Sequence, residues 1–316
     1  GFGIDGFRLD AVRHTPPAFF DAQMDQPGPT VSVGDLLPSL HALRPNLAAF
    51  GEDLTSTPWE LREYAKTGMN LADFPFKFAI NNVFNSAGFG DLGGTFSNLP
   101  GTEPATGLVY AQGGLGSTVG IAFVQSHDEG PPQSDNLAHA LMMARPAQPI
   151  VYFDGLNIQP GNWGHFPRPG RYDALGAGGD TLLRQLDARA RFARGVVVNR
   201  FVSPNLYVFE RVVQGSGLLL VGLNLRGDLT ALTETVDTAF APGTLLEDLS
   251  GQRPDVVVDP NGRVTLTVPS NSVPGNSHNA RGYGLYAPKA PAAAKGAAAV
   301  ELVDDATGAA LSTATI

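Results

Sequence analysis

Three acidic residues, Asp10, Glu52 and Asp128, each stand at the end of a stretch that is predicted to form a β-strand. The first gap between them fits one βα repeat of roughly 30 residues with an insertion, and the second gap fits two repeats. In a (β/α)8 barrel built from such repeats, the carboxyl ends of the strands converge on one pocket at one face of the barrel. The three carboxylates are therefore predicted to meet above one pocket.

Carboxylates that meet in this way could cleave a glycosidic bond. One attacks the anomeric carbon and one carboxylic acid protonates the leaving oxygen, and in retaining enzymes the two lie about 5–5.5 Å apart. A third carboxylate could hold substrate hydroxyls and balance the positive charge that develops in the transition state. For each acid taken alone, the competing interpretation is a cap on the helix that follows the strand.

Predicted strands and helices alternate along residues 1–194, which is typical of an α/β region with a parallel sheet. The predicted strands are Ile4–Val12, Leu47–Phe50, Met69–Phe74, Gly116–Val124 and Pro149–Phe153. The predicted helices include Pro29–Leu43, Pro58–Ala65, Phe76–Phe84, Asp135–Met143 and Thr181–Phe192.

The pattern changes at Gly195 into short β-rich runs separated by Gly, Pro, Asn and Asp. These runs predict an antiparallel β-sandwich over residues 195–287. Residues 288–299 are rich in Ala and Pro and are predicted to form a linker. Residues 300–316 resume an apolar–polar pattern, which indicates either the start of a further module or a disordered tail.

Composition narrows the classes of protein. A net charge of -9 with no basic stripe argues against a nucleic-acid partner. The sequence has no cysteine, which excludes disulfides and thiolate metal sites, and no apolar run approaches the roughly 20 residues that span a bilayer. Because the sequence begins Gly1-Phe2-Gly3 without Met, we expect it to enter a domain midway, with any export signal upstream.

Four segments resemble motifs of the α-amylase family, glycoside hydrolase family 13. Gly6–His14 (GFRLDAVRH) resembles the nucleophile segment and Phe50–Glu52 the acid/base segment. Phe123–Asp128 (FVQSHD) resembles the segment that ends in a His-Asp pair, and Gln148–Gly155 looks like the last barrel strand. The resemblance covers about residues 1–287 and implies roughly strands four to eight of a (β/α)8 TIM barrel, followed by an all-β antiparallel C-terminal domain.

The resemblance also implies a role for each matching residue. Asp10 would be the nucleophile, Glu52 the general acid and then the general base, and Asp128 a carboxylate that binds sugar hydroxyls and stabilises the transition state. Arg8 lies two residues before Asp10, on the same face of the strand, and would pair with it. His127 would bond hydroxyls of the sugar that is cleaved.

Arg13 and His14 match a pair that contacts the leaving-group side of the substrate, although a solvated charge is the competing interpretation for Arg13. Family members commonly bind a structural calcium ion, Ca2+. In this sequence only the backbone carbonyl of His14 matches one of its ligands, so most of the implied calcium site lies outside the chain.

The sequence departs from the family pattern in three places. The Asp-x-x-x-Asn-His motif of the third barrel strand and the strands around it are absent from it. Gln125-Ser126 replaces the usual acidic-Asn pair. Phe153-Asp154-Gly155 ends the last strand, where the family has Gly.

The resemblance predicts a retaining hydrolase of α-glucans such as starch and maltodextrin, secreted, monomeric and with a further carbohydrate-binding module. A transglycosylase on the same scaffold, a non-catalytic glucan-binding protein and a fragment that does not fold alone are the alternatives. A Gly-x-Gly-x-x-Gly pattern at Gly1–Gly6 does not predict a dinucleotide site, because it leads into a strand and does not open a helix.

Overall fold

The structure is a computed structural model that describes residues 6–20, 36–45, 47–97, 120–126, 128–151, 181–274, 280–290, 299–303 and 310–315. The chain divides into two compact units. The first unit comprises Gly1–Ala79, Thr102–Phe123 and Ala147–Val151, and the second comprises Ile80–Gly101, Val124–Pro146 and Tyr152–Ile316.

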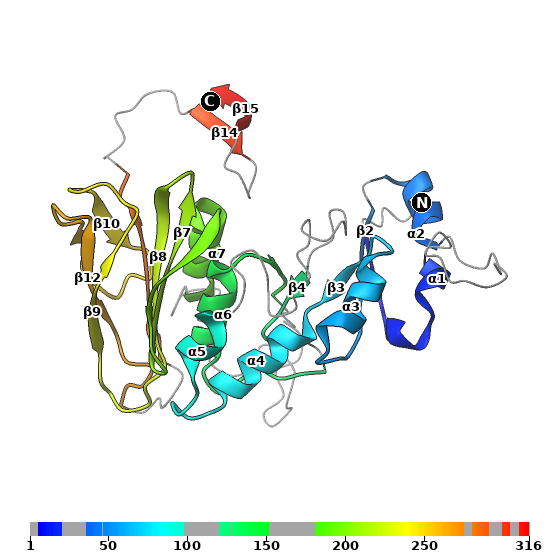
Figure 1. The fold of residues 1–316 in the computed structure, drawn as a ribbon, viewed down its shortest axis with the longest axis horizontal. Helices are drawn as coiled ribbons and strands as arrows, with labels where there is room; N and C mark the ends of the chain where they lie inside the picture. The colour runs from blue at the N-terminus through cyan, green and yellow to red at the C-terminus, as the bar shows by residue number, and fades with distance from the viewer. Residues whose placement is uncertain are drawn as a thin grey trace. The chain divides into compact units, whose positions relative to one another are not determined.

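A five-stranded parallel sheet forms the centre of the first unit, with its strands in the order β1-β2-β3-β4-β5 (Figure 1). The strands are β1 (Gly6–Leu9), β2 (Ala48–Gly51), β3 (Asn70–Ala72), β4 (Gly120–Ala122) and β5 (Gln148–Pro149). The predicted parallel sheet is thus confirmed. Its strands are shorter than predicted; β1, for example, stops before Ala11, whose φ of 48° ends the extended conformation.

Helices of the first unit pack around this sheet. They are the 3-10 helix η1 (Val12–His14), α1 (Pro17–Phe20), α2 (Leu36–Leu43), α3 (Pro58–Ala65) and the first half of α4 (Phe74–Phe84). One apolar cluster joins the helices to the sheet, and it consists of Val12, Phe20, Leu37, Ala49, Leu61, Tyr64, Ala65, Met69 and Leu71. Leu9 of β1, the residue before Asp10, also packs against this cluster.

In the second unit, the described residues between 196 and 288 form two antiparallel sheets, as the β-rich pattern after Gly195 predicts. The larger sheet has the order β11-β10-β13-β8-β7-β6, and the smaller pairs β9 with β12. The strands are β6 (Val196–Val202), β7 (Leu206–Val213), β8 (Ser216–Asn224), β9 (Leu232–Asp237), β10 (Leu245–Asp248), β11 (Val256–Val257), β12 (Arg263–Val268) and β13 (Tyr283–Pro288).

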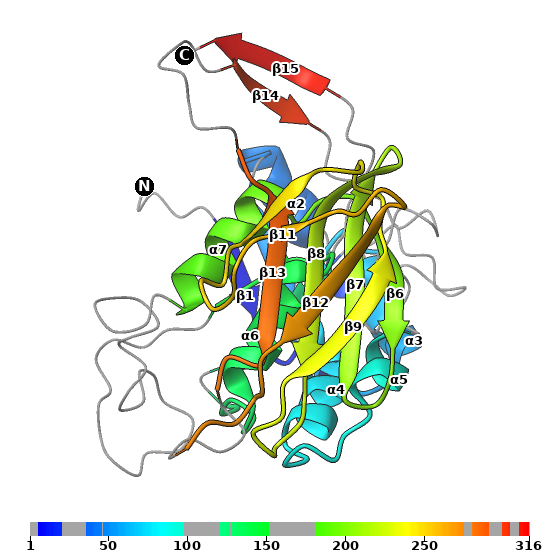
Figure 2. The ribbon, with the colours of Figure 1, turned by 90° about the vertical axis from the view of Figure 1, so that its left-hand side faces the viewer.

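These two sheets face one another across a shared apolar core, and three helices cover the opposite face of the larger sheet (Figures 1 and 2). The helices are α5 (Leu92–Ser97), α6 (Asp135–Ala144) and α7 (Thr181–Phe192). Helices α6 and α7 both contact β8, and α5 contacts β6 and β7. The unit therefore has three layers, of which the central one is the six-stranded sheet.

Two strands follow further along the chain, β14 (Ala299–Val303) and β15 (Ala310–Thr315), and they pair with each other as an antiparallel ribbon. The domain boundaries predicted above, including a linker over residues 288–299 and a further module after residue 300, stay predictions. Within the described part of the chain, no helix is both long enough and apolar enough to cross a membrane.

Candidate active site

Asp10 and Glu52 follow directly after two neighbouring parallel strands, at the carboxyl edge of the sheet. The register pairs Leu9 with Gly51, so that the two acids leave the sheet side by side. Two backbone hydrogen bonds continue beyond the strands: the Glu52 N–H donates to the Leu9 carbonyl, and the Val12 N–H donates to the Glu52 carbonyl, both at 2.9 Å. The ladder therefore fixes the backbone from which each carboxylate projects.

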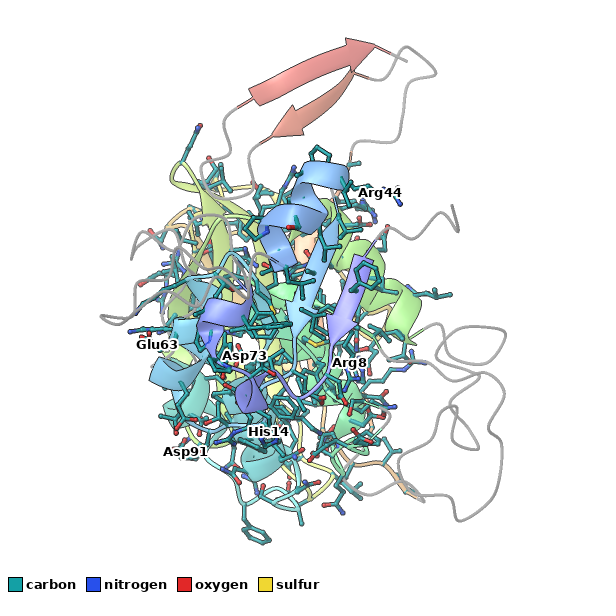
Figure 3. The ribbon with its side chains drawn as sticks, turned by 90° about the vertical axis from the view of Figure 1, so that its right-hand side faces the viewer. Arg8, His14, Arg44, Glu63, Asp73 and Asp91 are labelled. Carbon is teal, nitrogen blue, oxygen red and sulfur yellow. The ribbon has the colours of Figure 1, made fainter. Side chains whose placement is uncertain are left out.

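Arg8 joins the two carboxylates. Its Nη2 atom lies 3.1 Å from Asp10 Oδ1, and the same nitrogen donates a hydrogen bond to Glu52 Oε2 (Arg8 is labelled in Figure 3). Because one nitrogen reaches both acids, their nearest oxygens are no further apart than the roughly 5.5 Å typical of a retaining glycosidase. The Glu52 side chain is 18% exposed and that of Asp10 is 74% exposed, so the pair is open to a ligand from the Asp10 side.

Gly51 and Ala11 shape the chain next to these acids. A Cβ atom on Gly51 would lie 2.8 Å from Met69 Sδ and 3.0 Å from Val12 Cγ1, so a larger residue before Glu52 would have to displace the core side chains packed against it. Ala11 adopts a left-handed conformation directly after Asp10. Such strained non-glycine residues often cluster at functional sites.

A second charged cluster lies beside the pair and centres on Arg13. Arg13 Nη1 donates a hydrogen bond of 2.7 Å to the Leu54 carbonyl, while Nε lies 3.8 Å from Asp53 Oδ1 and Nη2 lies 3.9 Å from Glu60 Oε2. Asp53 is only 1% exposed. Neither of its carboxylate oxygens has a hydrogen bond from any residue that the structure describes.

Burial raises the pKa of Asp53 above its usual range, and the opposing attraction of Arg13 only partly offsets this rise. Sequence reasoning did not single out Asp53 or Glu60. An acid directly after Glu52 was the available signal, but only the packing shows that its side chain is buried. Arg13 is thus held by groups on the β2–α3 connection and on the first turn of α3, and its predicted contact with a leaving group stays a prediction.

Asp53→Asn is expected to stabilise the protein near neutral pH, by a few degrees in Tm. Because the folded-state pKa of Asp53 is raised, its carboxyl favours folding at low pH and loses that contribution as pH rises. The advantage of the variant should therefore grow as pH rises above 3.8, the usual pKa. Thermal unfolding across the acid-to-neutral range measures it, with Glu63→Gln as an exposed control in the same unit; a less stable variant at neutral pH would show that the attraction to Arg13 dominates.

Asp128 belongs to the second unit, in the segment after β4. Ser126 organises this turn: its Oγ accepts hydrogen bonds from the N–H groups of Asp128 at 3.2 Å and Glu129 at 3.1 Å, and its own N–H donates to the Glu129 carbonyl. Ser126, which departs from the family pattern, therefore holds the backbone of Asp128 in place through its hydroxyl group. His127 lies outside the described residues, and the meeting of Asp128 with the Asp10–Glu52 pair stays a prediction.

The described residues do not by themselves fit a calcium ion. Calcium takes six to eight oxygen ligands in proteins. No group of three or more His, Asp or Glu side chains that could hold a metal occurs among the residues that the structure describes. His14, at the end of η1, would contribute one backbone carbonyl (labelled in Figure 3). Calcium therefore stays a prediction, and no chemical step is derived through it.

The chain thus combines a parallel sheet that carries two bridged carboxylates at its carboxyl edge with a unit of antiparallel strands. No protein-family model matches the chain. The cyclomaltodextrin glucanotransferase of Geobacillus stearothermophilus is 23% identical over 273 residues, which cover 79% of this chain and 34% of that protein. The chain thus spans about a third of the length of the curated relatives it matches.

Solved structures show the same fold. A γ-cyclomaltodextrin glucanotransferase from alkalophilic Bacillus clarkii superposes with a TM-score of 0.63 at 19% identity, covering 90% of this chain and 40% of that one. The α-amylase of Geobacillus thermoleovorans, in complex with acarbose, superposes with a TM-score of 0.60 at 17% identity and covers 91% of this chain and 60% of that one. The homologues of this chain are cyclomaltodextrin glucanotransferases and α-amylases, and the predicted resemblance to the α-amylase family is confirmed.

Proposed function

We propose that this chain carries the catalytic carboxylates of a retaining glycoside hydrolase that cleaves α-glucosidic bonds in starch-like glucans. The observation that supports this most directly is the pairing of Asp10 and Glu52 through Arg8 at the carboxyl ends of adjacent parallel strands. We further propose that β1 to β5 are strands of a closed (β/α)8 barrel, since carboxyl ends of barrel strands are where active sites form.

In the proposed reaction, the Asp10 carboxylate attacks the anomeric carbon while Glu52 donates its proton to the glycosidic oxygen. The bond to the leaving sugar breaks, and a glycosyl ester on Asp10 forms. Glu52, now a carboxylate, takes a proton from water, whose oxygen attacks the anomeric carbon and releases Asp10. Two inversions give net retention of the α configuration.

The remaining predicted residues complete this proposal. Asp128 and His127 would bind hydroxyls of the sugar at the cleavage point, and Arg13 and His14 would contact the sugar that leaves. Arg8, which contacts both Asp10 and Glu52, would hold the two carboxylates in place around the bond to be cleaved, because catalysis requires fixed positions of the reacting groups. Secretion, a monomeric state and a carbohydrate-binding module are further parts of the proposal.

A second candidate function is transglycosylation, and one observation favours it: the curated relatives that match the chain are glucanotransferases. The first half of the reaction would be identical. In the second half, Glu52 would deprotonate a sugar hydroxyl in place of water, and the product would be a longer or cyclic glucan.

Product analysis tests the two functions. Hydrolysis of soluble starch should create one new reducing end for each bond that is broken, whereas transfer should redistribute chain lengths or cyclise chains without a matching gain of reducing ends. Chromatography of the products and a reducing-end assay measure both quantities. If neither the chain lengths nor the reducing ends change, while the protein still binds starch, a non-catalytic glucan-binding function replaces the proposal.

A further inference from the structure

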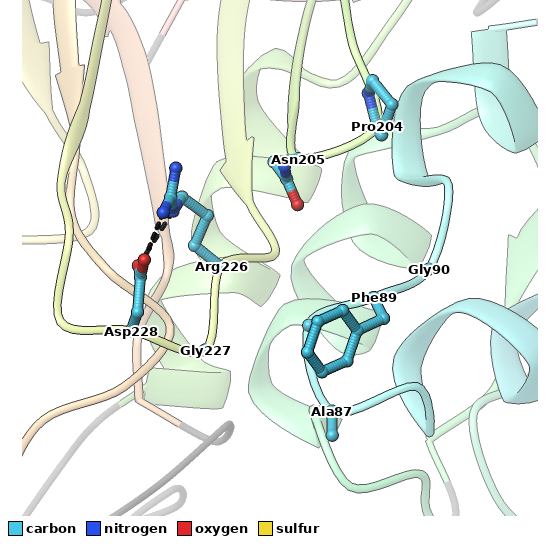
Figure 4. A pocket seen from close by; sticks show the side chains of 9 residues that line it. Ala87, Phe89, Gly90, Pro204, Asn205, Arg226, Gly227 and Asp228 are labelled. Atoms are coloured by element: carbon cyan, nitrogen blue, oxygen red, sulfur yellow. Dashed lines mark hydrogen bonds and ion pairs between the residues drawn. The ribbon is translucent and has the colours of Figure 1, made fainter.

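A hollow of about 500 Å³ opens on the second unit, and none of the residues assigned to catalysis above lines it (Figure 4). Three loops line it: the turn after α4, the β6–β7 connection at Pro204 and Asn205, and the segment after β8 at Arg226–Asp228. All three belong to the same compact unit. The volume falls within the roughly 300–1,000 Å³ of typical small-molecule sites.

Phe89 supplies the apolar surface of this hollow. Its side chain is 92% exposed, which is the largest exposure among the described large hydrophobic residues. The turn that carries Phe89 has a defined conformation. The Phe89 N–H donates a hydrogen bond of 3.1 Å to the Ser86 carbonyl, and Ala87 adopts a left-handed conformation with a φ of 54°. An exposed Phe on a strained turn is unusual, because the protein loses the hydrophobic stabilisation that burial of the ring would provide.

Glycines bring the first and third loops together. A Cβ atom on Gly88, whose φ is +90°, would lie 2.7 Å from the backbone nitrogen of Gly227. The second loop is tied to the third by a hydrogen bond of 2.8 Å from the Leu225 N–H to the Asn205 carbonyl. The hollow is therefore preformed by backbone contacts, which lowers the entropy that a ligand must overcome on binding.

The polar wall of the hollow carries no net charge. Arg226 and Asp228 form a bidentate ion pair. Arg226 Nε donates a hydrogen bond of 2.8 Å to Asp228 Oδ1, and Arg226 Nη2 donates a second hydrogen bond to Asp228 Oδ2. Hydrogen bonds from Arg226 lower the pKa of Asp228 to about 2, so the pair stays ionised. With the amide of Asn205 on the same wall, the lining offers donors and acceptors but no free charge for a metal or an anion.

We propose that this hollow is a second binding site for the α-glucan, separate from the residues that cleave it. The apolar C–H face of a glucose ring would stack on Phe89, and its hydroxyls would bond to Asn205 and to the Arg226–Asp228 pair. A neutral ligand with one apolar face and a rim of hydroxyls matches an exposed ring beside a self-neutralised ion pair. This inference rests on the proposed function for the identity of the ligand.

Calorimetric titration with maltoheptaose tests the site in the full chain carrying Asp10→Asn, which prevents turnover. Adding Phe89→Ala should weaken binding roughly tenfold at one class of sites, because the stacked apolar contact is lost. Phe89→Trp should preserve binding. Leu43→Ala removes a similarly exposed side chain on α2, 82% exposed, and should leave the isotherm unchanged.

An isotherm that is the same with and without Phe89→Ala, or the absence of any binding, overturns the second site. Starch turnover by the parent chain tests the proposed function separately. Turnover combined with an isotherm indifferent to Phe89→Ala rejects only the second site. A Phe89-dependent isotherm without turnover supports the second site and rejects only the proposed activity.

Discussion

Asp10→Asn and Glu52→Gln are each expected to lower the turnover of starch by about 10³-fold or more. An amide cannot serve as the nucleophile or donate the proton, and such groups contribute roughly 10²–10⁴-fold or more to a rate. Both changes preserve the shape of the side chain and leave the acceptor oxygen for Arg8. Reducing-end release from soluble starch, measured with the protein that carries this chain, gives the loss, and Glu63→Gln on α3 controls for removal of an acid.

An activated substrate separates the two roles. Fluoride leaves without a proton, so α-maltosyl fluoride needs the nucleophile but not the general acid in the first step. Glu52→Gln should therefore form the glycosyl ester on Asp10 from this substrate, and added azide should restore release of a sugar product with retained configuration. Asp10→Asn should show neither behaviour. Full starch activity in Asp10→Asn would reject the assigned roles. So would rescue by azide of Asp10→Asn instead of Glu52→Gln.

Arg200→Met is expected to destabilise the second unit by about 3–5 kcal/mol near neutral pH, because it leaves a buried carboxylate without its partner. Glu210 on β7 is fully buried. It accepts hydrogen bonds from Arg200 Nε at 2.7 Å and from the Ala239 N–H at 3.1 Å. Burial raises the pKa of Glu210 even in the presence of Arg200, so the charge is costly where it stands.

The pH dependence of unfolding identifies this cause. A raised folded-state pKa means that the contribution of Glu210 to stability is present below its ordinary value of 4.5 and is lost as pH rises. The deficit of Arg200→Met should therefore shrink in acid. Denaturant unfolding in acid and near neutral pH measures how much free energy of unfolding Arg200→Met loses. A loss that does not depend on pH would indicate lost packing by the Arg200 side chain instead of an unpaired charge.

Two further variants serve as controls. Arg200→Met combined with Glu210→Met should recover most of the loss, because paired replacement of a buried ion pair by apolar residues is often near neutral. Arg263→Met removes an exposed ion pair, with Asp237 82% exposed, and should change stability by no more than about 1 kcal/mol.

Local pattern was sufficient for the long regular elements. Helix α3 has the predicted bounds Pro58–Ala65, with proline in its first turn, and α7 has the predicted bounds Thr181–Phe192. Helix α4 begins at Phe74, two residues earlier than predicted, because Asp73 Oδ1 accepts the Phe76 N–H.

Helix α5, which is short and contains glycine, was not predictable in this way. Helix α5 (LGGTFS) includes two glycines, which oppose helix formation, and it was missed. It forms because Asp91 Oδ1 accepts the Gly94 N–H and because the N–H groups of Leu92 and Gly93 donate to the carbonyls of Pro204 and Ser203. Pro204 and Ser203 are distant from α5 in sequence, so no local pattern indicates these two contacts.

The amino-acid pattern was enough to predict three acids at strand ends, in motifs that resemble one family, within a parallel region followed by a β-rich one. Which side chains meet became visible only in the folded chain. Arg8 bonds both Asp10 and Glu52 because the β1–β2 register places Leu9 opposite Gly51. Asp53 is buried and Phe89 is exposed, against the usual preference of each residue type, because burial also depends on contacts between segments that are distant in sequence.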